Sequence, residues 1–147
     1  MKLLLFLLCI AAFLQSATAL PNIVLLVIIA RSFLIETSEN YYLGFGFGLL
    51  LSLLFNQPLG LISIFFLLVT FIIYMLKGLM VQTVWPLLLP FTLLVTVVDK
   101  LVTQMSFGGL TWFGVIVQTL AIIPIYILVQ IWEEQLVPPK AIRLKVK

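Results

Sequence analysis

The sequence predicts an all-α integral membrane protein, folded as a compact bundle of six transmembrane helices. Of its 147 residues, 64% are hydrophobic and only 9% are charged, whereas about a quarter of the residues in an ordinary soluble domain are charged. The charged side chains stand mostly at the ends of long apolar runs. A soluble core in so short a chain cannot hide this much apolar surface, but a lipid bilayer can receive it. The bilayer is therefore the first expected partner.

A proline and a polar cluster divide the first half of the chain. Pro21-Asn22 interrupts the first apolar run, because the residue before a proline is biased away from helix. The sequence Glu-Thr-Ser-Glu-Asn at 36–40 predicts a polar loop. The membrane segments expected here are Leu3–Leu14, with Ala19 as its furthest limit, Asn22–Ile35 and Tyr41–Phe55.

Turn residues divide the second half. A tight turn is expected at 56–58, a helix end at Lys77-Gly78 and a turn-rich loop at 104–109. The segments expected here are Leu59–Leu76, Leu79–Val98 and Leu110–Trp132. A helix of 15 residues is only about 22 Å long, less than the roughly 30 Å hydrocarbon core. We therefore expect one tightly packed domain over residues 1–135, followed by a short basic tail at 136–147.

Basic residues favour one side of the expected bundle. With six spans, seven of the eight Lys and Arg residues fall on the side of the N-terminus, and only Lys100 falls on the other. We expect the protein in the cytoplasmic (inner) membrane, and the positive-inside rule then predicts that both termini are cytoplasmic. Lys2, its apolar run and Ala17-Thr18-Ala19 also resemble a signal peptide, whose removal would leave five spans and an external N-terminus. The net charge of +3 is too small to indicate nucleic-acid binding.

Few residues in the chain suit catalysis or metal binding. The sequence has no histidine, which is the commonest general base and metal ligand. Its single cysteine, Cys9, lies in an apolar run and is expected to be a small core residue. No nucleophile with a neighbouring base, metal-ligand cluster or carboxylate pair is recognisable. The sequence therefore predicts no enzyme, cofactor or metal site.

Three glycines are expected at close helix contacts. Gly44 and Gly48 are four residues apart and share one helix face, where small residues let a neighbouring helix approach. A phosphate-binding loop is disfavoured, because no Lys-Ser/Thr pair follows and no strand precedes. Gly60 follows Pro58 and suits a turn between two antiparallel helices.

Two charged residues are candidates for an intramembrane role. Arg31 lies about one turn from the polar loop, so its side chain is expected to snorkel to the headgroups, with Glu36 or Glu39 as its pair. Asp99 precedes Lys100, and adjacent residues on a helix point about 100° apart. We therefore expect Asp99 to flank the outer interface, with an ion or relay site as the alternative.

Glutamines supply the remaining candidate polar contacts. Gln104, Gln118 and Gln130 are able to hydrogen-bond between helices. Gln118 and Tyr126 are two turns apart, with Pro124 between them. A kinked helix that lines a cavity is therefore an alternative to plain packing.

Several short motifs resemble the rod shape-determining MreD family of bacteria. In this family a Gln-Ser pair closes the first span, and a Pro-Asp or Pro-Asn pair opens the second; here they are Gln15-Ser16 and Pro21-Asn22. A Gly-Phe-x-x-Gly-Leu-x-x-Asp run and a Pro-Leu-Gly turn follow. The matching residues are Gly44, Phe45, Gly48, Leu49, Pro58, Leu59 and Gly60, and Ser52 stands where the family commonly carries aspartate.

The resemblance implies a non-enzymatic subunit of the bacterial cell-elongation machinery. Its partners would be an MreC-like protein, the actin-like MreB filament, the RodA glycosyltransferase and the elongation transpeptidase. Its role would be to help organise peptidoglycan synthesis along the side wall and to maintain rod shape. The family is also similar in fold to the substrate-binding components of energy-coupling-factor transporters. The alternative function is therefore the binding of a vitamin or another small molecule for transport.

Overall fold

The computed structural model describes residues 2–17, 21–79, 85–104 and 112–136. Within these ranges the chain is helical and contains no strand. The six helices are α1 (Lys2–Ala17), α2 (Ile23–Leu34), α3 (Glu39–Leu54), α4 (Leu61–Leu79), α5 (Trp85–Gln104) and α6 (Trp112–Leu136). The predicted all-α class and the predicted order of helices are confirmed. Of the predicted basic tail at 136–147, Leu136 belongs to α6, and residues 137–147 lie outside the described residues.

Helix α2 is the centre of the bundle. Nine of its 12 residues are buried, and it contacts each of the other five helices, most extensively α6 and α4. Its N-terminus is fixed by Asn22, whose side-chain oxygen accepts a hydrogen bond from the Leu25 backbone N–H. Such a cap satisfies one of the backbone donors that a helix start leaves unpaired. The predicted break at Pro21-Asn22 is therefore confirmed, and a side chain marks it.

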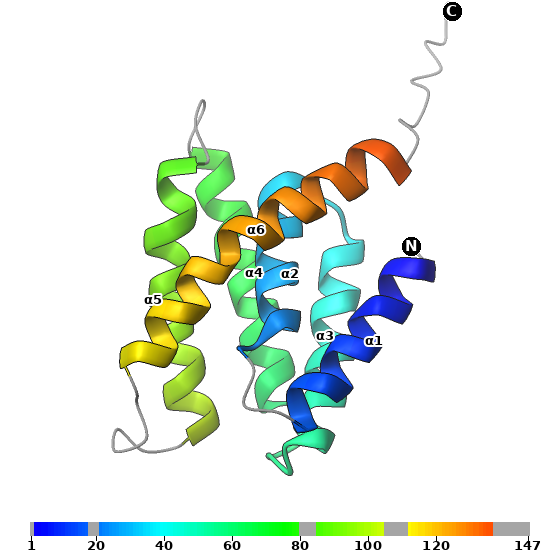
Figure 1. Cartoon of the computed structure of the whole chain (residues 1–147), viewed down its shortest axis with the longest axis vertical. Coiled ribbons are helices and arrows are strands. Elements are labelled where there is room, and N and C mark those ends of the chain that lie inside the picture. Colours follow the sequence, from blue (N-terminus) through cyan, green and yellow to red (C-terminus); the bar gives the residue numbers. More distant parts are fainter. Residues whose placement is uncertain (1, 18–20, 80–84, 105–111, 137–147) are drawn as a thin grey trace, which may run out of the picture.

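The helices alternate in direction, so that both described chain ends lie at the same end of the molecule (Figure 1). Helix α6 crosses the front of the bundle over α2, while α1 lies beside α3 and α5 packs mainly on α6. The α2–α3 connection lies near the beginning of α1 and the end of α6, and the α3–α4 turn lies at the opposite end.

Several predicted helix boundaries are wrong. Helix α5 continues past Val98, its predicted end, to Gln104. Helix α4 runs through Lys77 and Gly78 to Leu79, so this pair does not end the helix. Helix α3 begins at Glu39, so Glu39 and Asn40 belong to its first turn rather than to the polar loop. An acidic residue in a first turn is favoured, because it complements the positive end of the helix dipole.

Many large apolar side chains remain on the surface of the bundle. Phe6, Ile64, Leu94 and Leu128 are each more than 60% exposed and come from four different helices. Soluble monomers rarely expose so much apolar surface. Two helices, Leu61–Leu79 and Trp112–Glu134, are long and apolar enough to cross a membrane. Helices α1 and α2 are apolar but shorter.

Candidate functional site

Two polar clusters lie in the bundle, near opposite ends of α2. The first, which we call the Arg31 cluster, contains Arg31, Glu39, Asn40, Tyr74 and Glu133. The second, which we call the Asp99 cluster, contains Gln15, Asn22, Asp99 and Gln118. Buried polar groups are costly unless they are paired, so clusters of this kind are candidates for function as well as for structure.

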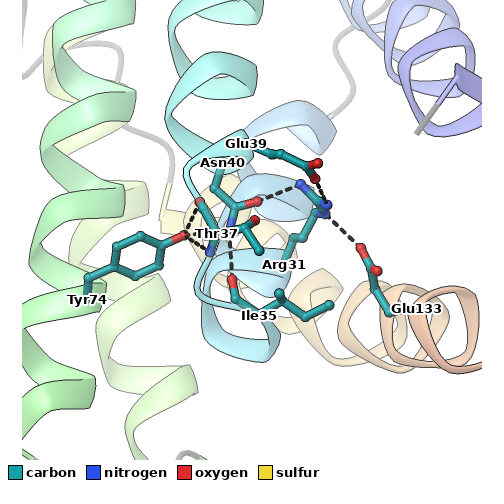
Figure 2. Close-up of polar contacts among 7 residues, drawn as sticks. All are labelled: Arg31, Ile35, Thr37, Glu39, Asn40, Tyr74 and Glu133. Carbon is teal, nitrogen blue, oxygen red and sulfur yellow. Dashed lines mark hydrogen bonds and ion pairs between the residues drawn. The ribbon is translucent and has the colours of Figure 1, made fainter. Parts of the chain in front are cut away.

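The Arg31 guanidinium binds residues from two other helices (Figure 2). Its Nε donates to Glu133 of α6 at 2.7 Å, and its terminal nitrogens donate to Asn40 at 2.7 Å and to Glu39 at 3.0 Å. Arg31 is only 3% exposed. The prediction that Arg31 snorkels to the headgroups is therefore wrong, because two carboxylates compensate its charge inside the protein. Of the two expected partners, Glu39 is in place, whereas Glu36 is exposed.

Asn40 extends the Arg31 cluster to α4. Its amide nitrogen donates to the Tyr74 hydroxyl at 2.7 Å and to the Ile35 carbonyl at 2.8 Å (Figure 2). The Tyr74 hydroxyl in turn donates to the Thr37 carbonyl at 2.9 Å and accepts from the Thr37 backbone N–H at 3.1 Å. The cluster therefore fixes the α2–α3 connection against both α4 and α6. Arginine suits this position because its planar donors reach several partners at once.

The Asp99 cluster joins α1, α2 and α5. The Asn22 amide nitrogen donates to the two Asp99 carboxyl oxygens at 3.2 and 3.4 Å. The Gln15 amide nitrogen donates to the Asn22 side-chain oxygen at 3.4 Å, and its oxygen accepts from the Val24 backbone N–H at 3.4 Å. Asp99 is only 3% exposed. The prediction that it flanks the outer interface is therefore wrong, because it faces into the bundle.

Gln118 of α6 lies against Asp99 and is completely buried. Its side chain interacts with the Asp99 carboxyl, although neither amide atom meets the strict geometry of a hydrogen bond to a described residue. Tyr126 is also buried, so both residues face the interior as their spacing predicts. Gln130 bonds Glu134 within its own helix at 2.9 Å and therefore does not join two helices. The side chain of Gln104 lies outside the described residues.

The close contact predicted at the glycines lies between α3 and α4. A Cβ atom added at Gly48 would stand 2.4 Å from the Ser63 Cα, which is too close to be accommodated without backbone movement. One added at Gly44 would meet the Phe66 Cβ at 3.5 Å, an ordinary contact. The Ser63 hydroxyl donates to the Phe45 carbonyl at 3.0 Å and so bridges the two helices. Of the three glycines of α3, Gly48 is therefore the one that lies directly against the α4 backbone.

The other motif residues have local structural roles. Ser52 is buried, and its hydroxyl donates to the Gly48 carbonyl at 2.9 Å within α3. Gly60 has a φ of +95°, which glycine adopts easily, and no atom lies near its position for a Cβ. Gly60 therefore serves the turn that also contains Pro58 and Leu59, rather than a helix contact. Asn56, with a φ of 53°, is the other left-handed residue of this turn.

Two apolar grooves lie between helices on the described surface. One separates α4 from α5 and is lined by residues that include Phe65, Ile72, Phe91 and Val98. The other lies between α1, α2 and α6, with Leu8, Val27 and Trp132 among its lining residues. Neither groove is lined by Asp99, Gln118 or Tyr126. The described residues also contain no group of three acidic or sulfur side chains that could hold a metal ion.

The distant partners of Arg31 and Asp99 were beyond the reach of sequence reasoning, although Glu39 was expected beside Arg31 and is there. Glu133 and Asn22 lie 102 and 77 residues away from them along the chain. One signal in the sequence pointed to Asn22, because its position after a proline is typical of a helix cap.

No protein-family model matches the chain, and no curated protein or solved structure shows significant similarity to it.

Proposed function

We propose that this chain is a non-enzymatic, multi-pass membrane subunit of the bacterial cell-elongation machinery, similar to the MreD family. In this role it helps organise peptidoglycan synthesis along the side wall and maintain rod shape. Its partners are an MreC-like protein, MreB, RodA and the elongation transpeptidase. One observation supports the proposal: the residues that match the family's motifs lie where the helices of this fold begin, turn or pack against one another.

These motif residues act where helices begin, turn or meet. Gln15 and Asn22 belong to the Asp99 cluster, and Asn22 also caps α2. Gly48 lies directly against the α4 backbone at Ser63, and Gly60 allows the turn between the two helices. Residues that specify how helices are connected and packed are suited to a scaffold protein. Ser52 stands at the family's aspartate position, and its hydroxyl donates to the Gly48 carbonyl of the same helix. The proposal therefore assigns no ionic role to this position.

The apolar surfaces favour a scaffold over a carrier of small molecules. The two grooves described above are lined by apolar side chains and lie open at the flanks of the bundle. A site for a vitamin needs convergent polar groups within a cavity, whereas apolar faces with few polar groups suit packing against other membrane helices. This contrast supports the scaffold function, with vitamin transport as the alternative to be tested.

Depletion of the protein from a rod-shaped host is expected to produce round cells while vitamin uptake stays unchanged. The expected cause is loss of an organised synthesis complex, so an MreC-like protein should co-purify with this chain from membranes. A thermal-shift screen of the purified protein against vitamins tests the alternative, because a bound ligand stabilises the folded state as its concentration exceeds the Kd. A saturable shift with one vitamin, together with normal shape after depletion, would overturn the scaffold proposal.

We further propose that all six helices cross the inner membrane and that both termini are cytoplasmic. Single cysteines at Ser38 and Leu59, placed in a Cys9→Ala background, are expected to report opposite sides. Both positions are exposed, whereas Asn40 is buried and unsuitable. An impermeant maleimide added to intact spheroplasts should label the Leu59 position and spare the Ser38 position until the membrane is broken. Labelling of Ser38→Cys in intact spheroplasts would contradict this topology.

A further inference from the structure

The groove between α4 and α5 has small side chains at its base and larger ones at its rim. Val69 and Val95 form the base and are only 2% and 3% exposed, whereas Leu68 and Leu94 at the rim are 51% and 61% exposed. The two helices share few contacts, and valines are too short to close the space between them. A volume of about 360 Å³ therefore lies open here, and the side chains that line it are all apolar.

The length of this groove matches one leaflet of a bilayer. Along α4 the lining runs from Leu76 back to Phe65, which is about 16 Å at 1.5 Å per residue. Half of the roughly 30 Å hydrocarbon core is about 15 Å. An acyl chain of a lipid and an apolar helix of another protein are the two occupants that an apolar groove of this length could receive, and the charge at its end separates them.

Lys77 lies at the end of the groove near the α2–α3 connection. It directly follows the lining residue Leu76, and its ammonium donates to the Ser32 carbonyl at 3.4 Å. The next residue of α2, Phe33, packs edge-to-face on the lining residue Phe91, with the ring centroids 5.6 Å apart. These two contacts connect the Lys77 ammonium to the end of the groove that Leu76 and Phe91 line.

The half-buried Lys77 ammonium has donors to spare. An ammonium carries three N–H donors, and the bond to Ser32 is long. Among the described residues Lys77 forms no ion pair, and Glu36, the acidic residue whose field reaches it, is exposed to solvent. An apolar groove that ends at a cation is complementary to a molecule with an apolar chain and an anionic head.

We propose that the α4–α5 groove binds one acyl chain of an anionic phospholipid of the cytoplasmic leaflet, with the lipid phosphate beside the Lys77 ammonium. Hydrogen bonds between an ammonium and a phosphate are strengthened by the two charges. The inference rests on the proposed membrane topology, which puts this end of the groove on the cytoplasmic side, and not on the scaffold function. The groove between α1, α2 and α6 remains open to a partner helix.

The test titrates the full chain, purified in detergent, with phosphatidylglycerol or phosphatidylethanolamine that carry the same acyl chains. Native mass spectrometry should show one phosphatidylglycerol bound with a Kd about fivefold lower than that of phosphatidylethanolamine, since a lysine near a lipid surface contributes about this factor. Lys77→Gln should remove the preference. Lys100→Gln is the matched control, because it removes the same charge from α5 beyond the other end of the groove and should keep the preference.

Val98→Phe fills the groove from one of its half-buried lining positions and should weaken the binding of both lipids at least fivefold. Val117→Phe is its matched control, because Val117 is exposed on α6 and lines neither groove. Unchanged binding to the Val98 variant would show that the lipid lies outside the groove and would overturn the proposal.

Two further results would contradict it. The first is equal binding of the two lipids, or binding of neither, by the unmodified protein, which would favour a partner helix as the occupant. The second is loss of the preference in Lys100→Gln instead of Lys77→Gln, which would move the lipid head to the other end of the groove. These measurements need no MreC-like partner, so their failure is distinguishable from failure of the scaffold function.

Discussion

Gly48→Ala should destabilise the bundle by about 1–3 kcal/mol, the range typical of overpacked cores. The added Cβ would meet the Ser63 Cα at 2.4 Å and its backbone nitrogen at 2.7 Å. These are main-chain atoms, so relief requires α3 and α4 to move apart. That movement would also stretch the hydrogen bond from the Ser63 hydroxyl to the Phe45 carbonyl. The free energy of unfolding, measured in mixed detergent micelles, reports the loss.

Gly46→Ala is the matched control for this prediction. Gly46 lies on the exposed face of the same helix, and no atom lies within 4 Å of its position for a Cβ. Alanine there should leave stability unchanged or raise it by up to about 1 kcal/mol, because alanine is the better helix former. Gly44→Ala should fall between the two, since its Cβ makes an ordinary contact at 3.5 Å. Equal stability of the Gly48 and Gly46 variants would refute a close contact at Gly48.

Arg31→Met should cost about 3–5 kcal/mol, the loss expected when one partner of a buried ion pair is removed. The Glu133 side chain, 7% exposed, would be left as an uncompensated carboxylate, and the Asn40 oxygen would lose its donor. Methionine keeps much of the length and volume of the side chain, so the loss reports on charge and hydrogen bonds rather than on a cavity. Unfolding titrations at constant pH measure it.

The two carboxylates around Arg31 should respond differently. Glu133→Gln is expected to be strongly destabilising, whereas Glu39→Gln should cost less than about 1 kcal/mol, because the Glu39 side chain is 46% exposed and screened by solvent. The double variant Arg31→Met/Glu133→Leu should recover part of the loss, since it removes both charges. Lys77→Met serves as the control, because Lys77 makes one long hydrogen bond, of 3.4 Å, to the Ser32 carbonyl. Equal losses for Arg31→Met and Lys77→Met would refute the cluster's importance.

Sequence reasoning succeeded where the signal is local. Pro21-Asn22 and the 56–60 turn separate helices as expected, and the four-residue spacing of Gly44 and Gly48 identified one packing face. These signals depend on residues a few positions apart, whose relative direction is fixed by helix geometry. The end of α4 was misplaced: the helix continues through Lys77 and Gly78 to Leu79, although no atom lies within 4 Å of the position for a Cβ at Gly78 and Leu79 is exposed.

The same reasoning failed for Arg31 and Asp99, and the cause is distance along the chain. A charge near the end of an apolar run is typical of a residue at the membrane surface, and nothing near either residue in the sequence contradicts that interpretation. Their burial depends on how α2, α5 and α6 are assembled in three dimensions. Pairing between segments about 100 residues apart is not encoded in local periodicity. Only two of the described helices are long and apolar enough to be recognised individually as membrane spans.

The distance between Arg31 and Glu133 also has a consequence for the order of events at the ribosome. Glu133 is synthesised 102 residues after Arg31, and at about 5–20 residues per second this takes roughly 5–20 s. During that interval the nascent α2 carries a cation whose main partner does not yet exist. The short helix therefore cannot reach its final environment when it leaves the ribosome. Its packing is completed only after translation of α6, so truncated chains that end before Glu133 should be degraded faster by proteases than the full chain.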